Sequence, residues 1–244
     1  MPEPINSLSG ILFINKPAGI TSHDVVDHVR RKLHMKRIGH AGTLDPMATG
    51  LLIILVGQAT KLSQYLMGLD KSYTGTMKLG ETTDSQDRDG EIVETKPVEG
   101  ITPEKIEEVA KTFVGDQYQT PPMFSAKKQG GVALYKLARK GVEVEREPRF
   151  IRIESLNVQK VELPFVTFDV RCSKGTYIRT IAHDIGQKLG VGAHLTSLVR
   201  TSIDKYQLSE AIDLDAFEAA DEAGVHRAVK PTYTVIPSRI LGTK

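Results

Sequence analysis

Hydrophobic positions along the chain follow strand-like and helix-like patterns in turn. The uninterrupted apolar run at 51–56 is typical of a central strand covered on both faces, and 10–15 is a second buried run of this kind. At 72–79 apolar and polar residues alternate, which predicts a strand with one wet face. Two further strands are predicted at about 150–161 and 165–172.

Three helices are predicted where apolar residues recur at intervals of three and four. Thr21 or Ser22 caps the first, Thr102 begins the second, and the third spans about 176–189 and ends at Gly190. Strands and helices follow one another too irregularly for a Rossmann alternation. The predicted fold class is therefore mixed α/β (α+β).

Composition sets limits without identifying a function. The 244 residues are 40% hydrophobic and 25% charged, enough to bury the core of one large domain or two small ones. No apolar run approaches the ~18–20 residues of a membrane span, and the N-terminus lacks a signal-peptide pattern. The single cysteine, Cys172, excludes an internal disulfide and paired-cysteine zinc sites, and the histidines lack metal-ligand spacing. We expect a cytoplasmic protein with no metal.

Charge is unevenly distributed, although the net charge is only +2. Residues 16–40 carry six Lys/Arg against two Asp, and residues 124–152 carry eight Lys/Arg against three Glu. Residues 81–119 instead hold eleven Asp/Glu and four Lys/Arg. This segregation is typical of a positive face for a polyanion such as RNA or DNA, but charged runs more often form ordinary solvated surface.

The segment Gly-His-Ala-Gly-Thr-Leu-Asp-Pro at 39–46 is the most informative part of the chain. It falls in a predicted glycine-rich loop at 36–50 and places Asp45 directly before the central strand. Since a carboxyl group with a pKa of about 3.9 is an anion at neutral pH, Asp45 needs no base to act as a nucleophile. An Asp-Pro pair is also common in turns and caps, and spacing alone favours that alternative.

Three other segments carry candidate chemistry, each of them weakly. Lys71-Ser-Tyr73 sets an aromatic residue on a strand near basic residues, and 121–128 opens a basic stretch with a short helix expected near 133–140. Residues 172–179 run from a strand into a helix start, where backbone N–H groups favour anions.

Residues 85–90 superficially resemble a calcium-binding loop. Lys96 occupies the twelfth position, where a bidentate glutamate is required, so a calcium site is excluded. A polar hairpin that turns at Asp89-Gly90 is predicted instead.

Together and in this order, the segments resemble the TruB family, the bacterial tRNA pseudouridine-55 synthases. Several motifs in one order carry the resemblance, which covers about four fifths of the chain. After Arg200-Thr201 the family usually has a Ser/Gly pair, whereas this chain has residues 202–205, Ser-Ile-Asp-Lys, so this loop is expected to differ. The matching segments are 10–22, 39–46, 71–80, 119–141, 172–180 and 192–201.

The resemblance implies a role for each matching residue. Asp45 corresponds to the catalytic aspartate, Tyr73 to the aromatic residue that stacks on the flipped uracil, and Arg179 to the arginine that pairs with the aspartate. These three are expected to converge on a single cleft. The other implied substrate-binding residues are His40, which helps to hold the T-loop, Tyr177 and Leu198, which line the uracil pocket, and Lys16, a basic residue of the first motif.

The resemblance also implies an architecture and a partner. The expected fold is that of pseudouridine synthases, a central mixed, largely antiparallel sheet flanked by helices, with a basic RNA-binding insertion at about 120–150. Residues 1–244 would form the catalytic domain, and the C-terminal PUA-type domain of bacterial relatives would be absent or truncated. The expected partner is the T-arm stem-loop of tRNA, bound by a monomer that needs no membrane, protein partner or cofactor.

Three functions stay open at this point. The primary expectation is an isomerase that converts a uridine of tRNA to pseudouridine, because the motifs are closest to those of stand-alone bacterial enzymes. The alternatives are an RNA chaperone that folds tRNA and the catalytic module of a guide-RNA complex. The Asp45 carboxylate could attack either C6 of the uracil or C1′ of the ribose.

Overall fold

The protein consists of two compact units in the computed structural model. Unit 1 comprises Met1–Lys71 and Val199–Lys244, and unit 2 comprises Ser72–Leu198. The helix expected near 133–140 falls, from residue 134 on, outside the part that the structure describes. The described residues are 5–125, 128–129, 132–133 and 144–241.

The sheet of unit 1 is built around β3 (Thr49–Val56), in which every residue after Thr49 is buried. β1 (Gly10–Lys16) pairs with β3 antiparallel along its whole length, and the C-terminal part of β12 (Ala193–Ile203) pairs with β3 in parallel. The apolar run at 51–56 therefore has the central place that its pattern predicts. Three short strands complete this sheet: β2 (Ile38–His40) beside β3, β14 (Ile212–Asp213) beside β1, and β13 (Tyr206–Gln207) beside β12.

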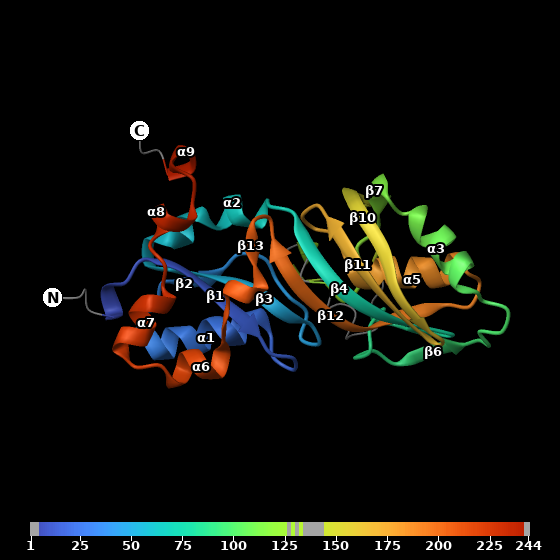
Figure 1. The fold of residues 1–244 in the computed structure, drawn as a ribbon, viewed down its shortest axis with the longest axis horizontal. Coiled ribbons are helices and arrows are strands. Elements are labelled where there is room, and N and C mark those ends of the chain that lie inside the picture. Colours follow the sequence, from blue (N-terminus) through green and yellow to red (C-terminus); the bar gives the residue numbers. More distant parts are fainter. Residues whose placement is uncertain (1–4, 126–127, 130–131, 134–143, 242–244) are drawn as a thin grey trace. The chain divides into compact units, whose positions relative to one another are not determined.

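Helices cover both faces of this sheet (Figure 1). The first, α1 (Ser22–Leu33), begins at Thr21, whose hydroxyl accepts from the Asp24 amide while the Asp24 carboxylate accepts from the Thr21 amide. On the opposite face lies a core that includes Phe13 and Ile53. The other helical elements of unit 1 are η1 (Ile5–Ser7), η2 (Gly57–Leu62), α2 (Ser63–Met67), η3 (Leu208–Glu210), α6 (Leu214–Ala219), α7 (Glu222–Ala228), α8 (Thr232–Val235) and α9 (Ser238–Leu241).

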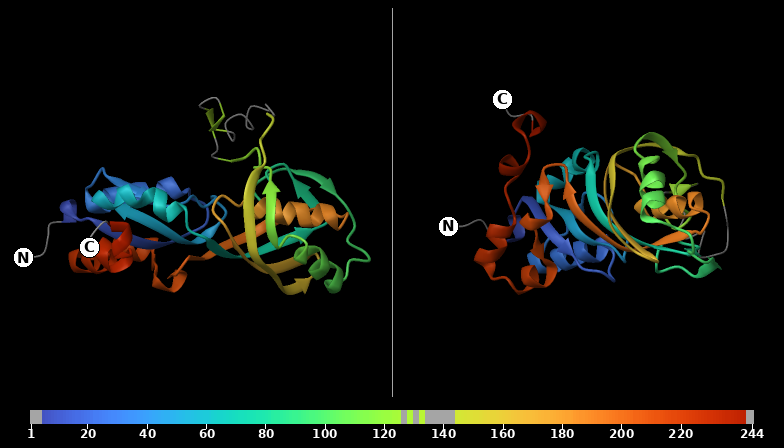
Figure 2. Two further views of the ribbon diagram at one scale, coloured as in Figure 1. Left: turned by 90° about the horizontal axis from the view of Figure 1, so that it is seen from above. Right: turned by 45° about the vertical axis from the view of Figure 1, so that its right-hand side comes forward.

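The sheet of unit 2 runs in the order β12, β4, β11, β10, β7. The strands β10 and β11 form a long antiparallel pair, and β7 pairs antiparallel with β10. In Figure 2 the helices α3 and α5 lie on one face of these curved strands. The elements of unit 2 are β4 (Lys71–Leu79), β5 (Glu81–Thr83), β6 (Ile92–Thr95), α3 (Pro103–Lys111), β7 (Gly115–Gln119), β8 (Lys128–Gln129), β9 (Val132–Ala133), β10 (Arg149–Glu162), β11 (Phe165–Cys172) and α5 (Ile178–Lys188).

These elements confirm the predicted fold class and every predicted strand and helix in the described part. The loop expected at 36–50 is wrong at two places, because 38–40 form β2 against β3 and 49–50 already belong to β3. Three residues are too few to show a period, and only the long-range pairing makes them a strand. The second face of β4 is half-buried rather than wet.

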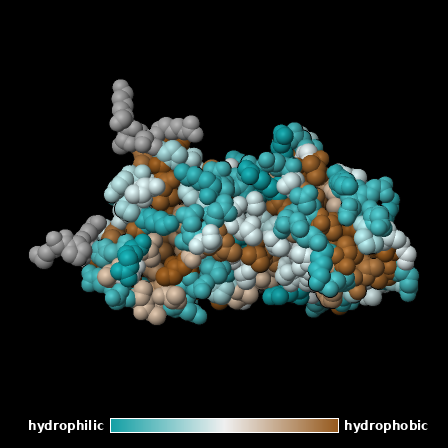
Figure 3. Space-filling view, in the orientation of Figure 1, coloured by the Kyte–Doolittle hydropathy of each residue, from teal (hydrophilic) through white to brown (hydrophobic). Residues whose placement is uncertain are grey.

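Several apolar side chains of unit 2 are exposed on its surface. Ile92, Val93, Leu163 and Phe165 are each more than a third exposed. On the face drawn in Figure 3, hydrophobic residues lie among hydrophilic ones. Within the described part of the chain, no helix is both long and apolar enough to cross a membrane.

Candidate active site

The loop that carries Asp45 connects β2 to β3 in unit 1, and backbone contacts hold it from two sides. The Ser22 hydroxyl at the start of α1 accepts from the Leu44 amide at 2.8 Å and donates to the Leu44 carbonyl at 3.1 Å. The Gly19 amide donates to the Pro46 carbonyl at 2.9 Å. Both neighbours of Asp45 are thus fixed, and Asp45 itself is half-buried.

Lys16, which the resemblance places in the site, lies beneath this loop as a fully buried ammonium group. Its Nζ donates to the carbonyl oxygens of Pro17 at 2.8 Å, Ile20 at 2.7 Å and Pro46 at 3.3 Å. Burial lowers the pKa of Lys16 to about 8, and the negative charge of Asp45 opposes that shift. An ammonium group near the candidate nucleophile therefore loses its proton close to physiological pH.

The lowered pKa predicts an alkaline limb in the rate of any reaction that Asp45 performs. Above pH 8 Lys16 is neutral, so Asp45 loses a nearby cation, and the single-turnover rate should fall with an apparent pKa near 8. The contribution of Lys16 to the free energy of unfolding changes with pH in the opposite direction to the rate: it increases as pH rises. Between about pH 8 and 10.5 the unfolded chain binds more protons than the folded one, so this group favours folding as pH rises.

The measurement is a single-turnover rate profile from pH 6 to 9.5, with the melting temperature recorded at each pH. Lys16→Arg should remove the limb, because a guanidinium group stays protonated over this range. A wild-type rate that is constant up to pH 9.5 would show that the charge of Lys16 does not act on the reaction.

His40, at the end of β2, is half-buried in unit 1. Burial first, and the charge of Arg200 second, lower the pKa of His40 below its usual value of 6.5. The imidazole is therefore neutral at pH 7, and it can both donate and accept a hydrogen bond but adds no charge for phosphate binding.

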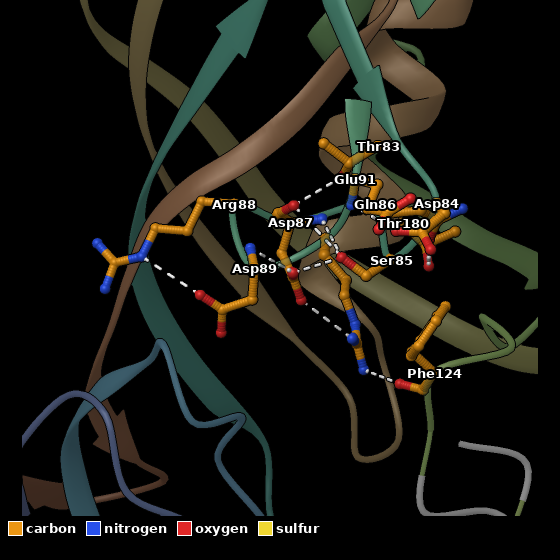
Figure 4. Close-up of polar contacts among 11 residues, drawn as sticks. Thr83, Asp84, Ser85, Gln86, Asp87, Arg88, Asp89, Glu91, Phe124 and Thr180 are labelled. Atoms are coloured by element: carbon orange, nitrogen blue, oxygen red, sulfur yellow. Dashed lines mark hydrogen bonds and ion pairs between the residues drawn. The ribbon is translucent and has the colours of Figure 1, made fainter. Parts of the chain in front are cut away.

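In unit 2, Arg179 and Asp87 form a buried ion pair (Figure 4). The Nη1 atom of Arg179 lies 3.1 Å from Oδ2 of Asp87, and both side chains are only 6% exposed. The Nη2 atom of Arg179 donates to the Phe124 carbonyl at 2.6 Å. The guanidinium plane is thus fixed by two partners, although Arg179 is the second residue of α5 and could otherwise rotate freely.

The Asp87 carboxylate is itself held by the turn between β5 and β6. Its Oδ1 accepts from the Ser85 hydroxyl at 2.6 Å and from the Asp89 amide at 3.1 Å. The Asp87 side chain therefore faces Arg179 with each carboxylate oxygen already bonded. Figure 4 labels Asp87 and the turn residues Ser85 and Asp89 that hold it. The polar hairpin predicted at 85–90 is confirmed as a turn, but its buried carboxylate was not foreseen.

The other predicted residues of unit 2 lie on β4, on β12 and at the start of α5. Gln119 holds Tyr177 from both sides, since its Oε1 accepts from the Tyr177 amide at 2.8 Å and its Nε2 donates to the Tyr177 carbonyl at 3.1 Å. Tyr73 lies on the buried face of β4 and is 9% exposed. Leu198 on β12 is 6% exposed.

The structure thus places Asp45, Lys16 and His40 in unit 1 and the other predicted residues in unit 2. Their convergence on a single cleft remains a prediction. Local sequence patterns do not identify Asp87, Gln119 or the buried Arg200 as site residues, because the side chain or loop that each one positions is far away in the chain. Among the described residues, no group of three His, Cys, Asp or Glu side chains could hold a metal ion.

Two family models match the chain in succession. The first, "TruB family pseudouridylate synthase (N terminal domain)", matches residues 30–178, and the second, "tRNA pseudouridylate synthase B C-terminal domain", matches residues 179–236. A protein of Opitutus terrae called tRNA pseudouridine synthase B is 57% identical over 98% of this chain and 99% of its own length. The protein of the same name from Syntrophotalea carbinolica is 52% identical over 86% of this chain and 69% of its own length.

Solved structures resemble the chain as well. A chain of the "Crystal Structure of a Cbf5-Nop10-Gar1 Complex" is 30% identical with a TM-score of 0.70, and the match covers 93% of this chain and 61% of that chain. A chain of the "Structure of H/ACA RNP bound to a substrate RNA containing 2'-deoxyuridine" is 27% identical with a TM-score of 0.66, covering 91% of this chain and 59% of that one.

Proposed function

Because this chain belongs to the TruB family of tRNA pseudouridine synthases, we propose that it isomerises one uridine in the T-loop of tRNA with Asp45 as nucleophile. The match to the Opitutus terrae enzyme over nearly the full length of both proteins carries this proposal. The loop around Asp45 supports it, because fixed neighbours on both sides are what a nucleophile in a defined position requires.

The reaction exchanges one bond of the nucleotide for another. The bond between N1 of the uracil and C1′ of the ribose breaks, and a bond between C5 and C1′ forms. C5 gives up its proton and N1 gains one, so the product is an isomer and no oxidant or energy source is consumed. The Asp45 carboxylate attacks either C6 of the base or C1′ of the sugar, and both routes need it ionised.

The base must first leave the folded loop, because a stacked nucleotide is out of reach of the enzyme. Extrusion costs a few kcal/mol, and stacking on the Tyr73 ring returns about 1–3 kcal/mol. Tyr177 and Leu198 then line the uracil pocket, and His40 holds the T-loop after the base has left.

Arg179 supplies the positive charge that keeps Asp45 ionised while the substrate excludes water. Its ion pair with Asp87 and its bond to the Phe124 carbonyl set the direction of the guanidinium before RNA arrives. Asp87 is thus a positioning residue that acts through Arg179, and Gln119 has the same relation to Tyr177.

The T-arm stem-loop is the proposed partner, and the chain is proposed to act as a monomer without a protein partner or guide RNA. A guide-RNA module is the second candidate, since the similar solved structures include an H/ACA ribonucleoprotein. The higher identity to the bacterial enzymes, 57% against 30%, favours the stand-alone form.

Purified chain mixed with an unmodified T-arm hairpin tests this choice. We expect complete conversion of one uridine without any added protein or RNA, measured by chromatography of the digested nucleosides. Conversion that appears only after partner proteins and a guide RNA are added would assign the chain to the guide-RNA class instead.

A further inference from the structure

Arg200 is a fully buried guanidinium group in unit 1 that no role described so far uses. It lies on β12 and is 1% exposed. Its Nε donates to the Leu51 carbonyl at 2.7 Å, Nη1 to Thr43 at 3.3 Å and Nη2 to Gly42 at 3.2 Å. In the part of the chain that the structure describes, these carbonyl oxygens are its hydrogen-bond partners, and no carboxylate forms an ion pair with it.

Two of these carbonyl oxygens belong to the start of the Asp45 loop, and the third belongs to β3, into which the loop leads. Gly42 and Thr43 precede Asp45, and Leu51 follows the loop in β3. One rigid, planar group with donors in a fixed fork therefore ties the start of the loop to β3. The Ser22 hydroxyl and the Gly19 amide hold the same loop at Leu44 and Pro46, so the Arg200 contacts are independent of theirs.

Close parallel pairing of β12 with β3 fixes the backbone of Arg200 beside Gly50. Arg200 pairs with Gly50 in the parallel β12–β3 ladder. Gly50 has a φ of +102°, and a Cβ atom added there would lie 2.4 Å from the Arg200 carbonyl oxygen. Only glycine fits this approach, and the approach brings the Arg200 side chain up to the loop.

A buried charge needs a reason, because an apolar side chain of similar volume usually stabilises a core as well or better. The effect of Arg200 on its neighbours indicates that reason. Burial is the main cause of the lowered pKa of both His40 and Lys16, and the charge of Arg200 lowers each of them further, so its field reaches the residues beside the Asp45 loop.

We propose that Arg200 is a positioning residue for Asp45, which clasps the nucleophile loop through three backbone carbonyl groups. The clasp fixes where the carboxylate meets the substrate and adds a positive charge that does not depend on bound RNA. This inference rests on the proposed function of Asp45 and adds a residue that acts through it.

Arg200→Lys tests the clasp, because lysine keeps the charge but cannot bond all three carbonyl groups in one plane. We expect the single-turnover rate of uridine conversion to fall about 100-fold, as for a nucleophile displaced by about 1 Å, while the Kd for tRNA changes less than about twofold. Phe217→Leu in α6 is the control, since it perturbs a fully buried side chain of the same unit that lies outside the Asp45 loop and β12. If Phe217→Leu lowers the Tm as much as Arg200→Lys does, it should still convert uridine at the wild-type single-turnover rate.

Hydrogen exchange gives a second readout that does not depend on activity. Amides of residues 41–50 should exchange faster in Arg200→Lys than in wild type, and at the wild-type rate in Phe217→Leu. If Arg200→Lys loses no more rate than the control, or loses affinity instead of rate, the proposal is wrong. Should Arg200→Lys fail to fold, Arg200→Gln, which keeps N–H donors but not the planar fork, is judged by the same rate, affinity and exchange criteria.

Wild-type conversion and its loss in Asp45→Asn are measured in the same assay. If wild type converts uridine and Asp45→Asn does not, a normal rate in Arg200→Lys counts against the clasp alone. If Asp45→Asn converts uridine, the proposed role of Asp45 is wrong. The Arg200→Lys result then says something only about the structure of the loop.

Discussion

Asp45→Asn should abolish conversion of uridine while leaving tRNA binding intact. The substitution keeps the size and shape of the side chain but removes the negative charge, and an amide is a very poor nucleophile. The proposed stacking on Tyr73 and the proposed RNA contacts of the basic segments do not depend on this carboxylate. The Kd should therefore stay within about threefold of wild type, or tighten slightly because an anion near the phosphate backbone is gone. The same variant therefore separates an isomerase from a pure RNA chaperone.

The assay follows pseudouridine formation under single-turnover conditions, beside tRNA affinity, with mass spectrometry to exclude deamidation back to aspartate. Asp215→Asn, an exposed carboxylate in α6 of the same unit, is the matched control and should convert uridine at the wild-type rate. Near-normal conversion by Asp45→Asn would remove Asp45 from the mechanism.

Arg179→Gln should lower both the reaction rate and the stability of the protein. Under the proposed mechanism it removes the charge that keeps Asp45 ionised, and loss of one such group typically lowers a rate about 10²–10³-fold. It also leaves the Asp87 carboxylate, 6% exposed, without its cation. Breaking a buried ion pair on one side costs about 3–5 kcal/mol, although the Ser85 and Asp89 bonds to Asp87 reduce this cost.

The double variant Arg179→Gln/Asp87→Asn distinguishes the two effects. Since it removes both charges, it should regain much of the free energy of unfolding measured in urea, yet its single-turnover rate should stay as low as that of Arg179→Gln. Recovery of the rate together with stability would show that Arg179 acts only through packing. An unchanged stability in Arg179→Gln would contradict the buried ion pair itself.

Local patterns predicted the elements whose residues carry their own signal. The helix α1 shows both a period and a capping residue, and β3 is apolar from Leu51 onward, so each was predicted close to its observed bounds. The strands β2 and β7 carry no such signal, because short polar segments become strands only by pairing with a distant partner. The register of β12 against β3 at Gly50 likewise depends on a long-range approach.

The candidate site likewise combines residues with a local sequence signal and residues whose role depends on long-range contacts. A glycine-rich loop before an apolar strand is visible locally, and together with the family resemblance it singled out Asp45. The residues that hold the site are not visible locally, because Arg179 and Asp87 are 92 positions apart and Arg200 is 158 positions from Gly42. A single arginine or aspartate in a sequence is as compatible with an exposed surface position as with a buried ion pair. Only the fold brings such pairs together.

The central claim is that this chain converts one defined uridine of tRNA to pseudouridine, and position-resolved chemical labelling of pseudouridine tests it most directly. An unmodified tRNA transcript is incubated with purified chain, labelled, and sequenced beside an untreated sample and one treated with Asp45→Asn. We predict one stoichiometric signal, in the T-loop, that is absent from both comparison samples. No signal, or signals of equal strength at uridines outside the T-loop, would contradict the account.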